Sequence, residues 1–270
     1  MDKRATASMK LTCALRIFLT FLFLITLAEM TTFLVNPTFG LIIHSILFLS
    51  LIVLSVLWQK ENNGSNLFLS LSIAPLLRIF GLSMPLAYFP PYAWYLIAGV
   101  PVLIAAFAVI KIQNLRPVDL GINIKKPASQ FAIMLTGIPF GILEYFILMP
   151  APIIDGLSAI AVVFLAGAFI VATGFAEELV FRGVLQNNAV KVFGSKTGLI
   201  AVSMIFMVLH IGWLNILDVV FVFAISMFFG FLVLKTGSLA GVSLSHGLIN
   251  VLLFIIMPST VTLINSLTPK

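Results

Sequence analysis

Charged residues are scarce in this chain, and their scarcity excludes a soluble globular protein. Only 9% of its 270 residues are charged, whereas 61% are hydrophobic, which is too apolar for the surface of a soluble domain of this length. Apolar runs close to the roughly 20 residues that cross a bilayer as a helix recur along the whole sequence. We therefore predict an all-α fold, a polytopic transmembrane helical bundle without a separate soluble domain.

Cysteine and several catalytic signatures are also nearly or wholly absent. The single Cys13 leaves no pair for a disulfide. The sequence contains no H-E-x-x-H zinc-protease helix, no G-x-S-G of the rhomboid type and no G-x-G-D aspartyl motif. It also contains no internal repeat, which disfavours an inverted-repeat transporter.

Nine hydrophobic segments are predicted to span the membrane. They cover residues 11–35, 39–58, 67–87, 92–112, 130–149, 157–185, 197–212, 214–235 and 238–257. Eight spans is the alternative, because very short turns separate the segments around Pro90-Pro91 and around Gly212. The first segment is interpreted as a retained span, because no convincing signal-peptide cleavage site follows it.

The positions of the basic residues predict the orientation. They concentrate at the N-terminus and in the loops near residues 60, 111–126, 191–196 and 235, which nine spans would place on one side. The positive-inside rule then puts the N-terminus in the cytoplasm and accounts for the net charge of +6. We expect a multi-pass protein of a prokaryotic plasma membrane, in contact with the lipid bilayer and with no nucleic-acid partner.

A pair of adjacent carboxylates lies within the sixth predicted span, where an ionisable side chain costs about 2.5–3.5 kcal/mol to insert. Glu178 and Arg182 are four residues apart, so they share a helix face and can form an ion pair. Glu177 points about 100° away from Glu178. We predict that Glu178 and Arg182 support the structure and that Glu177 is free for chemistry.

Side chains from two other spans can reach Glu177. If the sixth and seventh spans turn near Gly194, His210 comes within about 5 Å of the level of Glu177 along the helix axes. In the ninth span, His246 and Asn250 share one face because they are also four residues apart. These four groups are predicted to meet in a polar intramembrane cavity.

The order of these residues resembles a known family. The patterns E-E-x-x-x-R at 177–182, F-x-x-x-H at 206–210 and H-x-x-x-N at 246–250 look like those of the CPBP intramembrane proteases, which include the type II CAAX prenyl endopeptidases. The motifs lie within 157–257. The resemblance implies a catalytic transmembrane core over 130–270, preceded by variable transmembrane spans over 1–129, and a cavity open to the cytoplasmic leaflet.

The resemblance also assigns roles to the four side chains. It implies that Glu177 activates water, that His210 assists, and that His246 and Asn250 stabilise an oxyanion. We therefore expect an intramembrane endopeptidase, a hydrolase that cuts a peptide bond near the cytoplasmic face. Its partner would be a membrane-associated or lipidated peptide or protein substrate, either of the CAAX type or a peptide undergoing maturation.

Other interpretations of the same residues stay open at this point. No cofactor is certain, but zinc is possible, with Glu177, His210 and His246 as ligands from three spans without local spacing. The alternative function is a non-catalytic membrane binding or immunity protein, or a proton-coupled carrier, that uses the same cavity. Each polar side chain could also be an ordinary interhelical hydrogen-bonding group. The three ordered motifs favour the enzyme.

Further charged residues lie in or near predicted spans, Asp218 among them. Arg16 and Glu29 are close to segment ends and are expected to extend toward the membrane surface. Arg78 and Glu144 lie deeper and are predicted to pair with each other or to shape the cavity. Neither Arg78 nor Glu144 is expected to be catalytic.

Overall fold

The protein is a bundle of membrane-crossing helices. A computed structural model describes residues 3–154 and 156–267, and every regular element in them is a helix. Nine helices of this part of the chain are long and apolar enough to cross a membrane: Leu11–Leu34, Pro37–Leu57, Asn62–Ser83, Tyr92–Ile112, Pro127–Leu148, Ala159–Phe193, Ser195–Trp213, Ile216–Thr236 and Ala240–Ile264. The all-α fold and the nine-span prediction are confirmed, and the chain is a multi-pass membrane protein.

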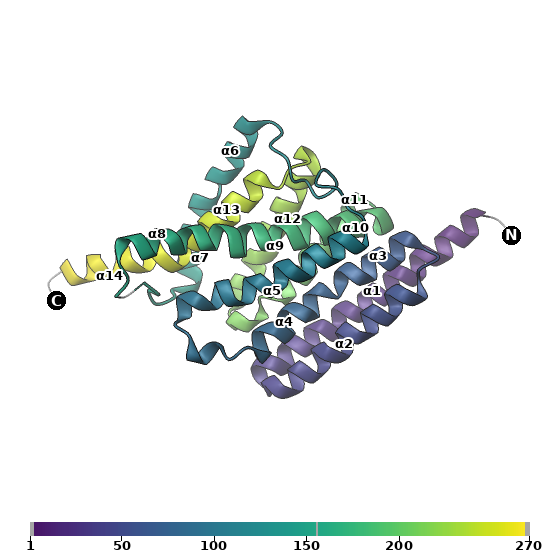
Figure 1. The fold of residues 1–270 in the computed structure, drawn as a ribbon, viewed down its shortest axis with the longest axis horizontal. Helices are drawn as coiled ribbons and strands as arrows, with labels where there is room; N and C mark the ends of the chain where they lie inside the picture. The colour runs from purple at the N-terminus through teal and green to yellow at the C-terminus, as the bar shows by residue number, and fades with distance from the viewer. Residues whose placement is uncertain (1–2, 155, 268–270) are drawn as a thin grey trace.

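The first four spans lie together on one side of the bundle (Figure 1). They are α1 (Lys3–Leu34), α2 (Pro37–Leu57), α3 (Asn62–Leu71) followed by α4 (Ile73–Ser83), and α5 (Pro91–Ile112), with the short 3-10 helix η1 (Leu86–Tyr88) before α5. The third span breaks between α3 and α4 because Pro75 has no N–H to bond the carbonyl of Leu71.

The second half of the chain supplies five spans, and the sixth of the nine is the longest. The fifth comprises α6 (Pro127–Leu135) and α7 (Gly137–Leu148). The sixth runs through α8 (Ala159–Phe169), the π-helix η2 (Ile170–Phe175), α9 (Ala176–Glu178), the π-helix η3 (Leu179–Leu185) and α10 (Gln186–Phe193). The others are α11 (Ser195–Val208) with the 3-10 helix η4 (Ile211–Trp213), α12 (Ile216–Thr236), and α13 (Ala240–Val251) with the π-helix η5 (Leu252–Ile256) and α14 (Met257–Leu267).

The predicted end of the sixth span at residue 185 is wrong, because polar side chains continue the helix inside the protein. Gln186 is buried and donates to the carbonyl of Gly230 at 3.0 Å. Asn188 is buried and donates to the hydroxyl of Ser70 at 2.9 Å. With these side-chain N–H groups bonded to neighbouring helices, α10 continues to Phe193, and the turn to α11 falls at Gly194 as predicted.

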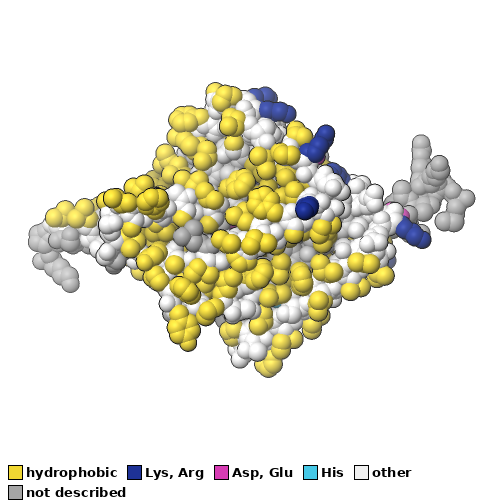
Figure 2. All heavy atoms as spheres, viewed as in Figure 1, with side chains coloured by type: hydrophobic (Ala, Val, Ile, Leu, Met, Phe, Trp, Pro, Cys, Tyr) yellow, Lys and Arg dark blue, Asp and Glu magenta, His cyan; other side chains and the backbone are white. Residues whose placement is uncertain are grey.

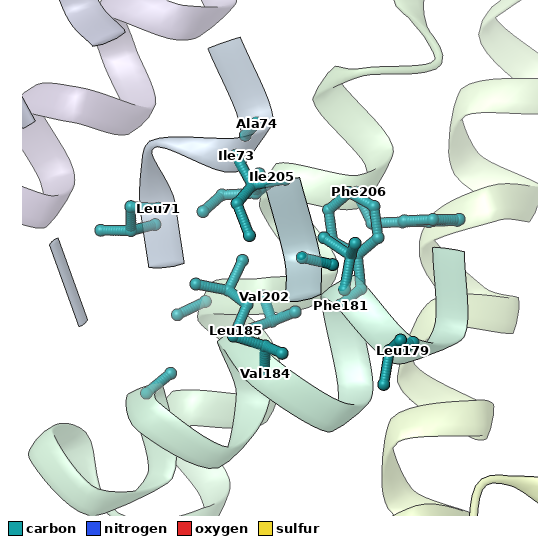
Figure 3. Close-up of a cluster of buried hydrophobic side chains, with 14 of the residues drawn as sticks. Leu71, Ile73, Ala74, Leu179, Phe181, Val184, Leu185, Val202, Ile205 and Phe206 are labelled. Atoms are coloured by element: carbon teal, nitrogen blue, oxygen red, sulfur yellow. The ribbon is translucent and has the colours of Figure 1, made fainter. Parts of the chain in front are cut away.

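The two halves of the chain share one hydrophobic core, drawn in Figure 3. Leu71, Ile73 and Ala74 come from the third span, and they are grouped with side chains of η3 and α11 such as Leu185 and Ile205. In a bilayer such packing stabilises by close van der Waals contact, since the lipid is as apolar as the side chains. The N-terminal spans are thus packed against the helices that carry the motifs.

The outer surface suits a lipid environment. Figure 2 shows one face covered largely by hydrophobic side chains, with the visible lysines and arginines gathered toward the upper right. The exposed side chains include large apolar ones such as Phe23, Phe164 and Ile160. An apolar surface of this extent would be costly in water and is expected where lipid covers it.

The sixth and ninth spans cross with their backbones in contact. A Cβ atom on Gly174 would lie 2.5 Å from the carbonyl oxygen of Ser243, and one on Gly247 would lie 2.6 Å from the Cα of Ile170. Both obstacles are backbone atoms, so these positions require residues without a side chain. The close crossing brings the glutamate pair of α9 beside α13.

Candidate active site

Two π-helical segments, η2 and η3, flank the glutamates of α9. Hydrogen bonds in a π-helix run from residue i to i+5, and such segments are rare in proteins and frequent at functional sites. The sixth span therefore changes from α-helical to π-helical hydrogen bonding on both sides of Glu177 and Glu178. The sequence predicts a regular α-helix for this span, because no residue pattern distinguishes a π-helix.

Glu178 is fully buried and has two partners. Its Oε1 accepts a hydrogen bond from Arg182 Nη1 at 2.9 Å and lies 2.8 Å from His246 Nδ1. Because an ionised carboxylate can only accept, His246 donates its Nδ1 proton. Arg182 also donates to Ser226 Oγ at 3.0 Å. The predicted Glu178–Arg182 pair is present, and Glu178 in addition orients the His246 ring, which the sequence spacing did not reveal.

Glu177 points away from this pair and into a cavity of about 170 Å³. Its side chain is 30% exposed, and its Oε2 lies 3.9 Å from His246 Nε2, beyond direct hydrogen-bond distance. His210 and Asn250 line the same cavity. The structure thus brings together all four side chains predicted to meet, and it makes Glu177 accessible to a molecule in the cavity.

His210 follows the end of α11 and has one ring nitrogen engaged. Its Nδ1 lies 2.8 Å from the carbonyl oxygen of Phe206, which can only accept, so Nδ1 carries the proton and Nε2 is left as an acceptor. The Phe206 ring is centred 4.7 Å from the His210 ring and 6.1 Å from the His246 ring. Arg182 Cζ lies 4.5 Å from the centre of the same ring. Phe206 therefore forms the wall between the two histidines.

Asn250 is held by a threonine that sequence analysis did not single out. Its Nδ2 donates to Thr173 Oγ1 at 2.7 Å, and Thr173 in turn donates to the carbonyl of Phe169 at 2.6 Å. A side-chain amide has two N–H donors, so one remains available to a ligand. Thr173 lies in η2 and also lines the cavity. No motif spacing connects it to Asn250, because the contact depends on the crossing of the sixth and ninth spans.

The remaining charged residues differ from the predictions. Arg78 pairs with Glu29 at 2.8 Å, so the predicted pair with Glu144 is wrong. Glu144 lines the cavity, which agrees with the other prediction made for it. Glu29 was expected to reach the membrane surface, but it is fully buried, and His44 Nε2 lies 3.4 Å from its carboxylate. Residue spacing could not show that α1, α2 and α4 bring these groups together.

The side chains considered for zinc do not form a metal site. In residues 3–154 and 156–267, no group of three or more His, Cys, Asp or Glu side chains is arranged so that it could hold a metal ion. Glu177, His210 and His246 line one cavity but do not form such a group. The described residues therefore do not fit a resident zinc ion.

Comparison with protein families finds a match for part of the C-terminal half. Residues 157–252 match the family described as Type II CAAX prenyl endopeptidase Rce1-like. The matched segment contains all three motifs, from Glu177 to Asn250, and leaves out the N-terminal spans. Neither the comparison with curated proteins nor that with solved structures gave a match. This segment is thus similar to the type II CAAX prenyl endopeptidase Rce1-like family, a family of proteases, and the resemblance predicted from the motifs is confirmed.

Proposed function

We propose that this protein is an intramembrane endopeptidase in which Glu177 activates the attacking water. The observation that carries the proposal is the contrast between two adjacent glutamates. Glu178 is fully buried and bonded to Arg182 and His246, whereas Glu177 opens into the cavity. A general base must be within reach of the water that it deprotonates, and Glu177 meets that condition.

The reaction can be written with this chain's own residues. Glu177 takes one proton from water while the water oxygen attacks the carbonyl carbon of the scissile bond, which becomes a tetrahedral oxyanion. When this intermediate collapses, the C–N bond breaks and Glu177 passes the proton to the leaving nitrogen. The products are a carboxylic acid and an amine. A positioned general base typically contributes about 10²–10⁴ in rate.

Three neighbouring side chains are proposed to stabilise the oxyanion and to orient the water. Asn250 keeps one N–H available for the oxyanion. His246 can donate from Nε2 only when its ring is protonated, and the carboxylates of Glu177 and Glu178 lie on either side to balance that charge. The unprotonated Nε2 of His210 can accept a hydrogen bond from the water and orient it. Removing one such oxyanion donor typically costs about 3–4 kcal/mol of transition-state stabilisation.

The proposed substrate is a membrane-associated peptide, with a lipidated C-terminal peptide of the CAAX type as the first to test and a maturing peptide as the second. The first choice follows from the description of the matched family. The basic loops favour a cytoplasmic N-terminus, and the proposed location is a prokaryotic plasma membrane. Cleavage is then proposed near the cytoplasmic face.

The test uses purified full-length protein reconstituted in lipid vesicles. Wild type, Glu177→Gln and Glu144→Gln are each incubated with prenylated C-terminal peptides and with membrane peptides, with and without a zinc chelator. Glu144→Gln is the matched control, because it removes another carboxylate from the same cavity. We expect Glu177→Gln to lower the rate by about 10²–10⁴, and Glu144→Gln and the chelator to leave cleavage intact.

Two results would argue against this mechanism. Equal losses in both glutamine variants would favour a distributed role in binding or proton transport. Cleavage by wild type that the chelator abolishes would require a metal.

A further inference from the structure

A buried ionic cluster lies in the N-terminal spans, outside the family match. Arg78 of α4 donates from Nε to one carboxylate oxygen of Glu29 in α1 at 2.8 Å, and its Nη2 lies 2.8 Å from the other oxygen. The guanidinium thus makes one hydrogen bond, to Glu29 Oε1, and an ion contact with Oε2. Glu29 and His44 are fully buried, and His44 Nε2 lies 3.4 Å from Glu29 Oε1.

The cluster forms because α1 and α2 approach closely at Gly40. A Cβ atom at Gly40 would collide with Thr32 of α1. On α2, Gly40 precedes His44 by four residues, and on α1, Thr32 follows Glu29 by three, so each pair shares one helix face. The contact between the two helices therefore places Glu29 and His44 together.

Arg78 also reaches the helix that presents His210. Its Nη2 donates to the carbonyl oxygen of Leu209 at 2.7 Å. Helix α11 ends at Val208, and the last carbonyls of a helix lack intrahelical donors and favour a nearby positive charge. Arg78 thus caps the C-terminal end of α11, one residue before His210.

The same turn is held from α1 as well. A Cβ atom on Gly212 would lie 2.5 Å from Phe33 Cζ, so the Phe33 ring packs directly against the turn. Arg78 Cζ lies 4.9 Å from the centre of that ring. Residues 209–212 are therefore fixed by Arg78 and by Phe33, both outside the family match.

We propose that Arg78 is a positioning residue for His210. The N-terminal spans hold Arg78 through Glu29, and Arg78 fixes the turn that points His210 into the cavity. Arg78 is not among the described residues that line the cavity, so it acts through Leu209. This inference rests on the role proposed for His210 in hydrolysis.

The test compares four full-length proteins in lipid nanodiscs: wild type, the double variant Glu29→Gln/Arg78→Gln, Arg78→Lys, and Arg16→Gln. The double variant removes both charges, so it leaves no unpaired buried ion that could prevent folding. Lysine keeps the charge but lacks the separate guanidinium nitrogens that contact Glu29 and Leu209 at the same time. Arg16 is an exposed arginine of α1 and serves as the control.

Two readouts are measured. One is hydrogen–deuterium exchange of the amides of residues 209–214, and the other is kcat and KM for a peptide that wild type cleaves. In the double variant we expect exchange about tenfold faster and kcat about 10- to 100-fold lower at unchanged KM, because His210 is misplaced while the substrate still binds. Arg78→Lys should be intermediate, and Arg16→Gln should match wild type.

The outcomes separate this inference from the proposed function. Unchanged exchange and kcat in the double variant would overturn it, as would equal changes in Arg16→Gln. If wild type cleaves no peptide in the panel, the proposed substrate or the proposed function fails, and the exchange of residues 209–214 still decides whether Arg78 holds the turn.

Discussion

Replacing Glu178 with alanine should destabilise the protein as well as stop catalysis, whereas Glu177→Gln should stop catalysis alone. The Glu178 carboxylate is fully buried and accepts from Arg182 at 2.9 Å and from His246 at 2.8 Å. Alanine would leave the Arg182 guanidinium, whose side chain is only 1% exposed, without its carboxylate inside the bundle.

The expected loss can be worked from these contacts. Breaking a buried ion pair by removing one partner costs about 3–5 kcal/mol, and a hydrogen bond to a charged group contributes about 1.5–3 kcal/mol. Because both bonds use the same oxygen, the two losses overlap, and we expect about 4–6 kcal/mol in all. For Glu177→Gln we expect less than about 0.5 kcal/mol, since that side chain is partly exposed and the change keeps its shape.

The assay is an unfolding titration of each purified variant in lipid–detergent micelles. Intrinsic fluorescence can report it, because Trp213 stacks on Phe254 at the wall of the cavity. Glu178→Gln is a useful third variant, since it keeps the volume and removes the charge, and its stability should lie between the other two. Equal stability of Glu178→Ala and Glu177→Gln would refute the reasoning.

Two other predictions concern the helix crossing and the loop before the fifth span. Gly174→Ala should destabilise the protein by about 1–3 kcal/mol, because its Cβ would lie 2.5 Å from a backbone oxygen of α13. Gly167→Ala is the control and should not destabilise it, because a Cβ there meets nothing within 4 Å. Unfolding titrations of both variants would test this. The pKa of Asp119 is lowered to about 2, because Arg116 donates side-chain and backbone hydrogen bonds to its carboxylate. Its contribution to loop stability should therefore be complete at neutral pH and lost only as pH falls from about 3.8 through 2. A titration of the Asp119 carboxyl carbon by NMR with a midpoint near 3.8 would contradict this.

Features that depend on helix periodicity could be predicted from the sequence. The Glu178–Arg182 pair and the shared face of His246 and Asn250 follow from a spacing of four residues. The level of His210 follows from the turn at Gly194 and the rise of the helix. These arguments need only one helix, or two helices joined by a short turn, so each pair could be placed before the fold was known.

Features that depend on contacts between distant helices could not be predicted. The bond from His246 to Glu178 requires the close crossing at Gly174 and Gly247, and an isolated glycine in an apolar helix does not identify its partner. Glu29 and Arg78 are 49 residues apart in the chain, and nothing in their spacing joins them. Polar groups in membrane spans find their partners through packing, and packing is fixed by the whole bundle.

The π-helix η3 also affects how the chain tolerates changes in length. A single-residue deletion within residues 179–185 could be absorbed locally, because the i to i+5 hydrogen bonds there can shorten to the i to i+4 bonds of an α-helix. Deletion of Asn187 in α10 would instead rotate every following residue of that helix by about 100° and take the buried amide of Asn188 away from its partner Ser70. The sixth span therefore contains one stretch that can lose a residue without turning the helix beyond it, and that stretch begins directly after the glutamate pair.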